Sequence, residues 1–485
     1  MNYKMIGRFI AQILTIESVF MIPALIISLC CGEHNAVVGF LITLAIMLVL
    51  EAVLFWLCRG APNAFYVKEG FACVGVSWIV LSLLGCLPFY ISGEIPHFVD
   101  AFFEIVSGFT TTGASVVSDI ESLSRGILYW RSFSHWLGGM GVLVFLLALG
   151  PGSAGKSGFT MHLLRAESPG PDVGKLVPKM RRTATILYLI YIGLTVADVV
   201  FLLAGNMPLF DAVCTAFGTA GTGGFGIMND SMAGYSPYLQ MVTAVFMLLF
   251  GINFSCYYLL LLRQVKSVLF DEELRFYLIT VAVSIALITW NVFRLYDSLG
   301  ETLRHVFFQV SSIITTTGFS TTDFDMWPSF SKAILLFLMM VGACAGSTGG
   351  GLKCTRVLLL FKSLGRNIKQ ILNPNKVLVV RNNKRTVDET VLDNLGAYLA
   401  AYVIIGVLSF LVISLDGFSV ETNLSAMLAC FNNIGPGFDA VGPMSNFSGY
   451  SVLSKLVLSF DMLAGRLEIF PMLVIFSSAT WKRHR

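Results

Sequence analysis

Charged side chains are scarce along the whole chain. Asp, Glu, Lys and Arg make up 13% of its 485 residues, the hydrophobic set makes up 56%, and the mean hydropathy is +0.78. A soluble domain carries about 25% charged residues. This composition excludes a soluble enzyme, a nucleic-acid-binding module and a disordered chain, and it indicates an integral membrane protein. The net charge of +3 is too small to predict a nucleic acid as partner.

Paired cysteines and clusters of metal ligands are also lacking in the sequence. Most of the ten cysteines lie inside apolar runs, as Cys73 and Cys214 do, which predicts reduced thiols packed as small hydrophobic side chains. No His/Cys group has the spacing of a metal site, and no nucleophile stands beside a base. We therefore expect neither an enzyme active site nor a bound organic cofactor in this chain.

Long apolar runs, in contrast, are abundant. Ten of them reach the length of about 20 mostly apolar residues that a membrane span needs. Most Lys and Arg fall into alternate gaps between the runs and near the two ends of the chain, which predicts that both termini are cytoplasmic. The predicted spans lie at about 8–29, 36–58, 69–92, 133–150, 183–205, 237–262, 274–294, 331–360, 394–416 and 452–479.

Four outer loops share one pattern, an apolar helix followed by a Gly/Thr-rich break and a polar return. Aligned on one glycine each, the loops match without a gap, and six residues before each glycine stands a small residue, as expected where a short helix approaches a neighbour. A predicted span precedes and follows every loop, so the chain from residue 69 to residue 479 contains four equivalent units. The aligned glycines are Gly113, Gly224, Gly318 and Gly435, and the small residues are Ser107, Gly218, Ser312 and Ala429.

The predicted fold is an all-α polytopic membrane protein. Four pseudo-symmetric span–pore-helix–span repeats surround a central pore, and two N-terminal spans stand outside them, which gives ten transmembrane helices and four re-entrant pore helices. The predicted boundaries are 1–60 for the N-terminal two-span unit and 61–165, 166–265, 266–375 and 376–485 for the repeats.

The four loops have the chemistry of a cation filter. Non-helical backbone at membrane depth persists only where it is buried in protein or lines water, and a ring of backbone carbonyls can replace the hydration shell of a monovalent cation. Glycine permits the torsions that point successive carbonyls inward, and the negative C-terminal ends of short helices favour a cation below the ring. A simple helix cap and turn would explain one such loop, but not four in register. The predicted filter residues are Thr111, Thr112, Gly113, Thr222, Gly223, Gly224, Thr316, Thr317, Gly318, Asn433, Ile434 and Gly435.

These loops resemble the filter segments of the Trk/Ktr/HKT superfamily of potassium transporters, specifically of its TrkH-type membrane subunit. The loop sequences are TTTGAS, TGGF, TTTGFS and NNIGPGF, and HWLGGMG (135–141), GACAGSTGGGLK (342–353) and AGRLE (464–468) are similar to the family's second-span signatures. The resemblance covers the chain from the third span onward. The sequence departs from the family pattern in two places. The second loop has extra glycines, Gly221 and Gly223, and in the fourth loop both Gly435 and Gly437 fit the position of the filter glycine. We choose Gly435 because it keeps the small-residue column intact.

The resemblance carries several implications. It implies a pore within one chain, a homodimer in the bacterial cytoplasmic (inner) membrane with surrounding lipid, and regulation by a cytosolic nucleotide-binding ring of the TrkA type. It also implies that K⁺ is the transported ion, because all four filter glycines are present and related branches with serine at the first position admit Na⁺. The basic inner loops, 153–182 and 353–393, would then dock the ring, although inside-positive topology and anionic lipid explain most of their charge.

A run of small residues interrupts the eighth predicted span. Such a run cannot hold a straight helix well, and below the filter it could obstruct the pore and swing aside at its glycines. The resemblance assigns this segment as an intramembrane gating loop, and close packing against a neighbouring helix is the alternative. The predicted gate residues are Gly346, Ser347, Thr348, Gly349, Gly350 and Gly351.

Arg466 is predicted to complete the gate. A charge inside a span is costly and usually functional, so we expect Arg466 to project into the cavity, repel ions and hydrogen-bond the gating-loop backbone. A buried ion pair with Glu468 that only holds helices together is the alternative. On the outer side, Asp323, Asp325 and Asp439 follow the filters, where they either concentrate cations or are solvated loop charges.

The sequence thus predicts potassium-selective uptake through a four-loop filter, with two rivals. One is an ion-coupled K⁺ symporter with alternating access, which the repeat without inverted halves disfavours. The other is a nucleotide-hydrolysing transporter that uses GPGSAGKS (150–157), a match to the phosphate-loop pattern that lacks the surrounding α/β domain. GTGGFG (221–226) also matches a dinucleotide pattern, but no βαβ unit surrounds it.

Overall fold

The computed structural model describes residues 3–60, 67–139, 141 and 180–481, and these parts of the chain are almost entirely helical. Within them the only strands are β1 (Arg381–Asn382) and β2 (Arg385–Thr386), a short antiparallel hairpin. The predicted boundary between the first two repeats, at residues 165 and 166, lies outside the described residues. The boundary at residues 375 and 376 lies between two helices. The boundary at residues 265 and 266 lies at the start of a five-residue helix.

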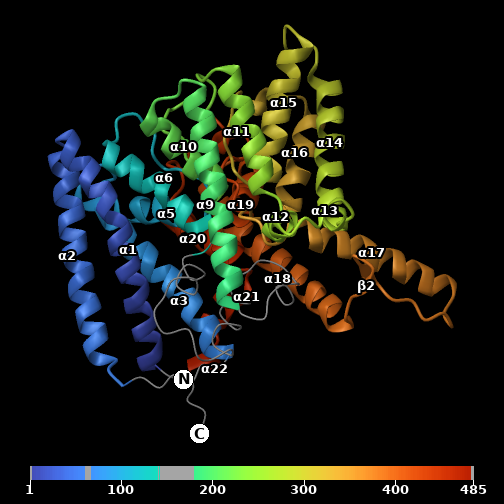
Figure 1. Ribbon diagram of the computed structural model, residues 1–485, viewed down its shortest axis with the longest axis horizontal. Coiled ribbons are helices and arrows are strands. Elements are labelled where there is room, and N and C mark those ends of the chain that lie inside the picture. Colours follow the sequence, from blue (N-terminus) through green and yellow to red (C-terminus); the bar gives the residue numbers. More distant parts are fainter. Residues whose placement is uncertain (1–2, 61–66, 140, 142–179, 482–485) are drawn as a thin grey trace.

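The N-terminal unit is a hairpin of two long helices, α1 (Tyr3–Cys31) and α2 (His34–Leu57), at the left edge of Figure 1. The turn between them passes through Gly32, whose φ of +72° is a conformation that glycine adopts without a Cβ clash. Many of their apolar side chains point outward, among them Leu48, Val49 and Trp56, each more than half exposed. An exposed apolar surface of this kind suits contact with lipid rather than water.

The first two repeats follow the predicted order of span, short helix and second span. In the first repeat a tilted pore helix, α5, packs against α6, and in the second repeat α10 packs against α9 and α11. The helices of the first repeat are α3 (Val67–Gly85), α4 (Leu87–Ile91), α5 (Phe98–Phe109) and α6 (Arg125–Gly139). Those of the second are α9 (Met180–Ala204), α10 (Leu209–Gly221), α11 (Pro237–Phe250), α12 (Phe254–Leu261) and α13 (Val265–Leu269).

The third and fourth repeats have the same order, and α17 of the third projects beyond the rest of the molecule at the right of Figure 1. The helices of the third repeat are α14 (Glu272–Val292), α15 (Leu299–Ile314), η2 (Phe324–Met326), α16 (Ser329–Val341) and α17 (Cys354–Leu372). Those of the fourth are α18 (Glu389–Ile413), η3 (Ser414–Asp416), α19 (Val420–Phe431), η4 (Asp439–Val441), α20 (Val452–Arg466), α21 (Phe470–Phe476) and α22 (Ser478–Trp481).

The second span of each repeat differs from the continuous helix that hydropathy alone predicts. The predicted span 237–262 is broken at residues 251–253, where α11 and α12 meet at 87°, and the span 452–479 is broken at residues 467–469. The eighth span is interrupted over residues 342–353, close to the predicted interruption by GACAGSTGGG (342–351), within which 346–351 are the predicted gate residues. In the first repeat, α6 begins at Arg125, ahead of the predicted residue 133, and most of the residues beyond Gly139 are outside the described part of the chain. Hydropathy averaged over the length of a span does not detect these breaks, because most of their residues are apolar or small and each break contains few polar ones.

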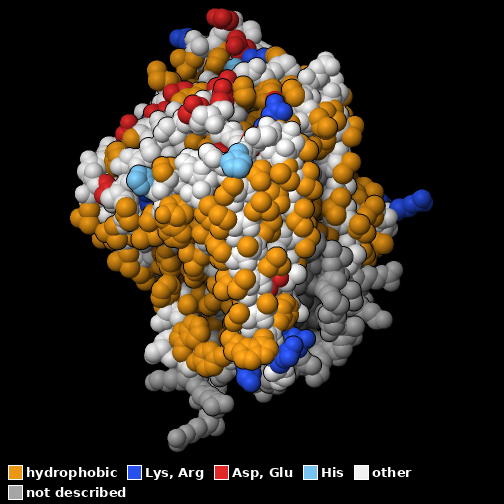
Figure 2. Space-filling model, turned by 90° about the vertical axis from the view of Figure 1, so that its left-hand side faces the viewer, with side chains coloured by type: hydrophobic (Ala, Val, Ile, Leu, Met, Phe, Trp, Pro, Cys, Tyr) orange, Lys and Arg blue, Asp and Glu red, His pale blue; other side chains and the backbone are white. Residues whose placement is uncertain are grey.

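Six of the described helices are long and apolar enough to cross a membrane, or seven if the bent pair α11–α12 counts as one span. Figure 2 shows a broad band of hydrophobic side chains around the middle of one face, with most acidic side chains toward one end and basic side chains toward both ends. Tyr3 and Trp481 are joined by a 2.9 Å hydrogen bond, so both ends of the described chain lie on the same side of the bundle (Figure 1). The full set of ten spans stays a prediction.

Candidate functional site

The four pore helices end in the same backbone conformation. One residue after the helix cap, or at the cap in the second repeat, the chain enters the left-handed region with φ between 53° and 57°, and two residues later an aligned glycine also has a positive φ. A left-handed conformation is uncommon for residues other than glycine and is concentrated at functional sites. The non-glycine residues are Thr111, Thr222, Thr316 and Asn433, and the glycines are Gly113 (83°), Gly224 (75°), Gly318 (90°) and Gly435 (98°).

The column of small residues closes these helix ends. In every loop the carbonyl of the small residue accepts a 2.8 Å hydrogen bond from the N–H of the residue just before the aligned glycine, five residues further along the chain. Bonds of this kind end a helix whose last turn is followed by a residue in the left-handed conformation. At Gly218 the smallness is also required by a neighbour, since a Cβ there would lie 2.9 Å from the ring of Phe319 in the third loop. The four bonds are Thr112 N to Ser107 O, Gly223 N to Gly218 O, Thr317 N to Ser312 O and Ile434 N to Ala429 O.

The four loops form a closed ring. Each aligned glycine faces the backbone carbonyl oxygen of the residue that precedes the glycine of the next loop, and a Cβ on any of them would collide with that oxygen. The ring runs from Gly113 to Gly223 O, from Gly224 to Thr317 O, from Gly318 to Ile434 O and from Gly435 back to Thr112 O. Four carbonyl groups thus lie side by side in one layer, and glycine is the residue that permits this approach.

The ring borders a cavity of about 120 Å³ to which all four aligned glycines contribute. Most of the remaining wall comes from the segments that follow the glycines in the loops. Arg131 of α6 is the one charged residue that lines the cavity. Two buried side-chain oxygens of the loops, Thr111 Oγ1 and Asn433 Oδ1, have no hydrogen-bond partner among the described residues. Buried polar oxygens without a partner are rare in proteins, and a bound cation would satisfy them.

The fourth loop offers two glycines, and their backbones differ. Gly435 has the positive φ of the other three aligned glycines and closes the ring, whereas Gly437 is not among the residues with positive φ. Gly437 instead donates its N–H to Val441 O at 2.7 Å and lies beside the Ser425 side chain. The alignment on Gly435 is therefore the one that preserves the fourfold pattern.

The predicted gate residues lie in the segment from Gly342 to Lys353, between α16 and α17, directly against the third and fourth loops. This segment is called the gating segment below, after its predicted role. Gly350 N–H donates to Thr316 Oγ1 at 2.6 Å, and a Cβ on Gly350 would collide with Asn432 O. The same segment is tied to the break in the second repeat, because Cys344 N–H donates to Gly251 O at 3.1 Å. The segment therefore lies just below the ring.

Arg466 lies at the C-terminal end of α20, where the last span of the fourth repeat is broken. Its guanidinium donates to the gating-segment carbonyl Thr348 O at 2.8 Å, to Gly139 O at 2.7 Å and to Gly138 O. Glu468, the alternative partner considered from the sequence, instead pairs with Arg356 of α17. Arg466 thus joins the gating segment to the end of α6 through backbone carbonyls.

Glu273, at the start of α14, was not singled out from the sequence. Its side chain is buried, and Oε1 accepts hydrogen bonds from Ala345 N at 2.5 Å and from Thr355 N at 3.2 Å. One carboxylate therefore holds both ends of the gating segment. The only signal in the sequence is a carboxylate in the first turn of an apolar helix, where the favourable helix dipole already explains it.

The three aspartates near the outer mouth are engaged by neighbouring side chains. Asp439 accepts hydrogen bonds from Ser419 Oγ at 2.7 Å and Thr422 Oγ1 at 2.6 Å, Asp325 pairs with Lys332 at 2.7 Å, and Asp323 caps η2. None of the three lines the cavity above the ring. This arrangement favours the structural interpretation of these charges over attraction of cations.

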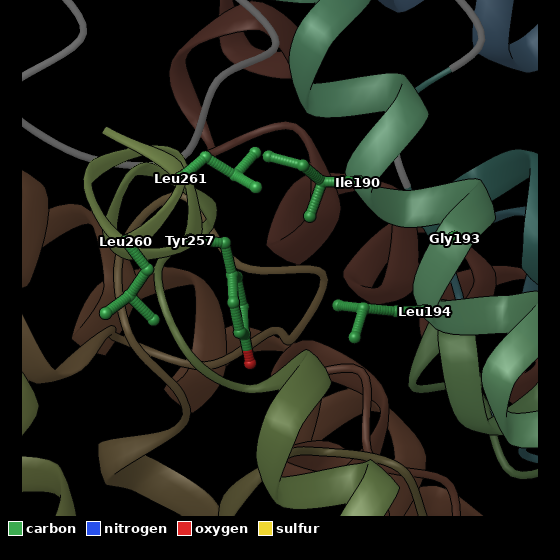
Figure 3. Close-up of a pocket in the computed structure, with 6 residues that line it drawn as sticks. All are labelled: Ile190, Gly193, Leu194, Tyr257, Leu260 and Leu261. Carbon is green, nitrogen blue, oxygen red and sulfur yellow. The ribbon is translucent and has the colours of Figure 1, made fainter. Parts of the chain in front are cut away.

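A second pocket, of about 360 Å³, lies between α9 and α12 and is wholly apolar apart from the Tyr257 hydroxyl. Figure 3 shows Ile190, Leu194 and Leu261 directed toward this space from the two helices. Tyr257 donates its hydroxyl to Leu249 O, so the pocket presents no reactive group. The phosphate-loop motif 150–157 and the basic loop 153–182 lie outside the described residues, apart from the start of α9.

Apolar spans, four equivalent helix–loop units and one closed ring of carbonyls define a helical membrane protein built around four loops that meet at one point. A sequence model of the TrkH family, described as "Cation transport protein", matches residues 37–483, and the chain belongs to this family. The resemblance inferred from the loop motifs is thereby confirmed.

Individual relatives match over nearly their whole length. The chain is 37% identical to the Trk system potassium uptake protein TrkH of Salmonella typhimurium and 36% identical to that of Escherichia coli K12, in both cases over 99% of this chain and all of the relative. The crystal structure of the potassium transporter TrkH from Vibrio parahaemolyticus matches with a TM-score of 0.89 at 30% identity, over 99% of this chain and 100% of that one.

Proposed function

We propose that this chain takes up K⁺ across the bacterial cytoplasmic membrane through the ring of its four pore loops. The single observation that carries the proposal is the closed ring in which each aligned glycine packs against a carbonyl of the next loop. Carbonyl rings of this kind replace the water around a monovalent cation. Relatives of full length that are named potassium uptake proteins support the same ion.

Electroneutral surroundings and helix orientation favour a weakly hydrated cation over a divalent one. The ring itself contains hydroxyl, amide and carbonyl oxygens but no carboxylate, and K⁺ is held well by such neutral dipoles. The C-terminal ends of α5, α10, α15 and α19 meet at the ring, so their negative dipole ends add to the attraction. The proposed ligands are drawn from residues 111–113, 222–224, 316–318 and 433–435.

The segment from Gly346 to Gly351 acts in this proposal as the gate. Its contacts to Thr316 and Asn432 support a closed arrangement beneath the ring, and the glycines at 346 and 351, with positive φ, supply hinges. Arg466 stabilises that arrangement through Thr348 O and adds a positive charge that opposes the passage of K⁺.

The assembly proposed for the chain is a homodimer in the inner membrane, with both termini cytoplasmic and a TrkA-type nucleotide-binding ring on that side. The word "system" in the names of the relatives supports a partner subunit. Several basic residues of the 353–393 segment are paired within the chain, since Lys362 contacts Glu272 and Arg366 contacts Glu389. The exposed Lys369, Lys376, Lys384 and Arg385 remain available to a partner.

Tracer uptake into proteoliposomes tests this proposal. Vesicles loaded with K⁺ and holding the purified protein should accumulate ⁸⁶Rb⁺, and external K⁺ should compete at concentrations at which Na⁺ and Li⁺ do not. A strict dependence on a Na⁺ or H⁺ gradient would favour a coupled symporter. Uptake that requires ATP and is lost in Lys156→Ala without any partner would favour nucleotide hydrolysis, and uptake in which Na⁺ competes as well as K⁺ would contradict potassium selectivity.

A further inference from the structure

We infer that three side chains of the first repeat, Glu104, Arg131 and His135, form a positioning strut that sets the discrimination between K⁺ and Na⁺. The strut holds the return arms of the first two loops, meaning residues 114–117 and 225–228, which follow the aligned glycines. The inference rests on the proposed function and deepens it. None of the three side chains is a proposed ligand of the ion. Arg131 also lines the cavity beside the ring, but the strut acts through the backbone that the three side chains hold.

Glu104 holds the first return arm from behind. It lies on α5, is fully buried, and accepts hydrogen bonds from Val116 N at 2.9 Å and from Ser115 Oγ at 2.9 Å. Arg131 Nε donates to the same carboxylate at 2.6 Å. Among the ion pairs of the described residues this one is the most buried, so the charges are compensated locally and breaking the pair would be costly.

Arg131 extends the contact to the second return arm. Its Nη1 donates to Gly226 O at 2.8 Å, and its guanidinium stacks over the ring of Phe225, 3.5 Å from the centroid. The planar guanidinium can serve Glu104, a carbonyl and an aromatic face at once, which a lysine ammonium cannot do. The two return arms are thereby connected through one rigid group.

His135, one helical turn further along α6, completes the strut. Its Nδ1 lies 2.8 Å from Gly108 O and its Nε2 accepts the Phe225 N–H at 3.2 Å. A carbonyl can only accept, so the ring is neutral and carries its proton on Nδ1. A Cβ on Gly223 would collide with the imidazole, which shows that the second loop rests directly on this ring.

The fourth repeat lacks all three side chains at the matching positions, and the second and third repeats lack the carboxylate. Gly138 and Gly465 make the same contact, each against the carbonyl four residues before an aligned glycine, Phe109 O and Phe431 O. This register matches Arg131 with Leu458, and His135 with Met462, in the fourth repeat. Nine residues before the aligned glycines, Glu104 corresponds to Thr215, Gln309 and Ala426. The fourth return arm is instead held by a hydroxyl, since Ser425 Oγ accepts from Phe438 N at 2.9 Å. The third is held by neutral groups, since Ser231 Oγ accepts from Ser320 N at 3.2 Å and His305 Nδ1 lies 2.9 Å from Thr321 Oγ1.

The strut bears on selectivity because K⁺ and Na⁺ differ in the carbonyl spacing that they require. Whether selectivity arises from cavity size or from the field of the carbonyl dipoles, it depends on where these groups are held. Partners outside a ligand shell commonly change ion affinity by about 10–100-fold when they are removed. Loss of the strut frees the arms next to Gly113 and Gly224, so the ring can contract around the smaller ion.

The test transplants the fourth repeat's residues into the first. A triple variant, Glu104→Ala with Arg131→Leu and His135→Met, removes both buried charges together and leaves none unpaired. In the ⁸⁶Rb⁺ competition assay, the ratio of the Na⁺ to the K⁺ inhibition constant should fall about tenfold relative to the wild type. Leu458→Met, at the position that matches Arg131, changes no polar contact and should leave the ratio within about twofold of the wild type.

Two single variants decide the question if the triple variant does not yield folded protein. His135→Gln keeps one donor and one acceptor and should retain the ratio, whereas His135→Met should lower it about threefold, as expected for lost hydrogen bonds. An unchanged ratio in the folded triple variant would overturn the inference, and so would an unchanged ratio in folded His135→Met where the triple variant does not fold. A wild type that does not discriminate K⁺ from Na⁺ would instead refute the proposed function, so the two failures are distinguishable.

Discussion

In the first repeat Gly138 packs against Phe109 O, and in the fourth repeat Gly465 packs against Phe431 O in the same way. Around this shared backbone contact the side chains differ, since the first repeat has a buried ion pair and a histidine where the fourth has leucine, methionine and alanine. The backbone of the ring is therefore fixed by glycines and helix caps, which recur, while the support behind it is specific to each repeat.

The largest effect is expected where the two repeats agree. Gly138→Ala and Gly465→Ala each place a Cβ against a backbone carbonyl that cannot move aside, so both should destabilise the protein by about 1–3 kcal/mol. Thermal unfolding followed by size-exclusion chromatography should give similar losses for the two variants. A large loss for one and none for the other would show that the two contacts are not equivalent.

The two repeats also differ at the residue after these glycines, which is Gly139 in the first and the charged Arg466 in the fourth. Because the Arg466 guanidinium donates to Thr348 O, Arg466→Ala should release the gating segment and raise Rb⁺ flux several-fold, about the effect of losing one or two charge-assisted hydrogen bonds. Arg466→Lys keeps the positive charge but loses the planar guanidinium that donates to several carbonyls at once, so it should give an intermediate flux. Unchanged or reduced flux in well-folded Arg466→Ala would remove Arg466 from the gate.

A smaller rise in flux is expected at Glu273, which has no counterpart bound to a gating segment in the first repeat among the described residues. Glu273→Gln keeps an acceptor but loses its charge, so its bonds to Ala345 N and Thr355 N weaken and flux should rise about twofold. Glu272→Gln is the matched control, because Glu272 is the neighbouring residue and its carboxylate contacts Lys362 rather than the gating segment. Equal effects of the two variants would speak against a specific role of Glu273.

The smallest effect is expected at Asp439, which is held by hydroxyls rather than lining the mouth of the pore. Asp439→Asn should change the apparent affinity for Rb⁺ by less than about twofold, as is typical of an exposed charge. A larger loss of affinity would restore the view that this aspartate concentrates cations.

The pH dependence of Asp439 gives a second readout. The Thr422 and Ser419 hydroxyls hold its pKa below the ordinary value of 3.8. Its contribution to stability is therefore present at neutral pH and is lost as the pH falls through the folded-state pKa. The difference in thermal stability between wild type and Asp439→Asn should accordingly begin to shrink below about pH 4 and disappear only below the folded-state pKa.

The four helix–loop units could be predicted from the sequence because the residues that end each short helix recur at the same spacing. The column from Ser107 to Ala429 and the aligned glycines are visible without coordinates, and the structure gives both a role in ending the pore helices. The break at residues 342–353 was predicted nearly to its ends, since the run of small residues GACAGSTGGG covers 342–351.

The supports behind the ring could not be predicted from the sequence. Glu104 and Arg131 are 27 residues apart on different helices, and no spacing rule predicts that they meet. His135 was noted only as part of HWLGGMG, and its contact with Phe225 joins two repeats. Glu273 likewise depends on the way α14 lies against a distant loop. Such contacts follow from the packing of the helices, which hydropathy and motif spacing do not specify.

The most direct test of the central claim compares Rb⁺ uptake by wild type and Gly113→Ser, with K⁺, Na⁺ and Li⁺ as competitors. A side chain on Gly113 would collide with Gly223 O, so the ring cannot keep its geometry in the variant. The account predicts that K⁺ alone competes in the wild type and that Na⁺ competes nearly as well in the variant, a change on the order of tenfold. Unaltered discrimination in folded Gly113→Ser would contradict the claim that these four loops form the filter.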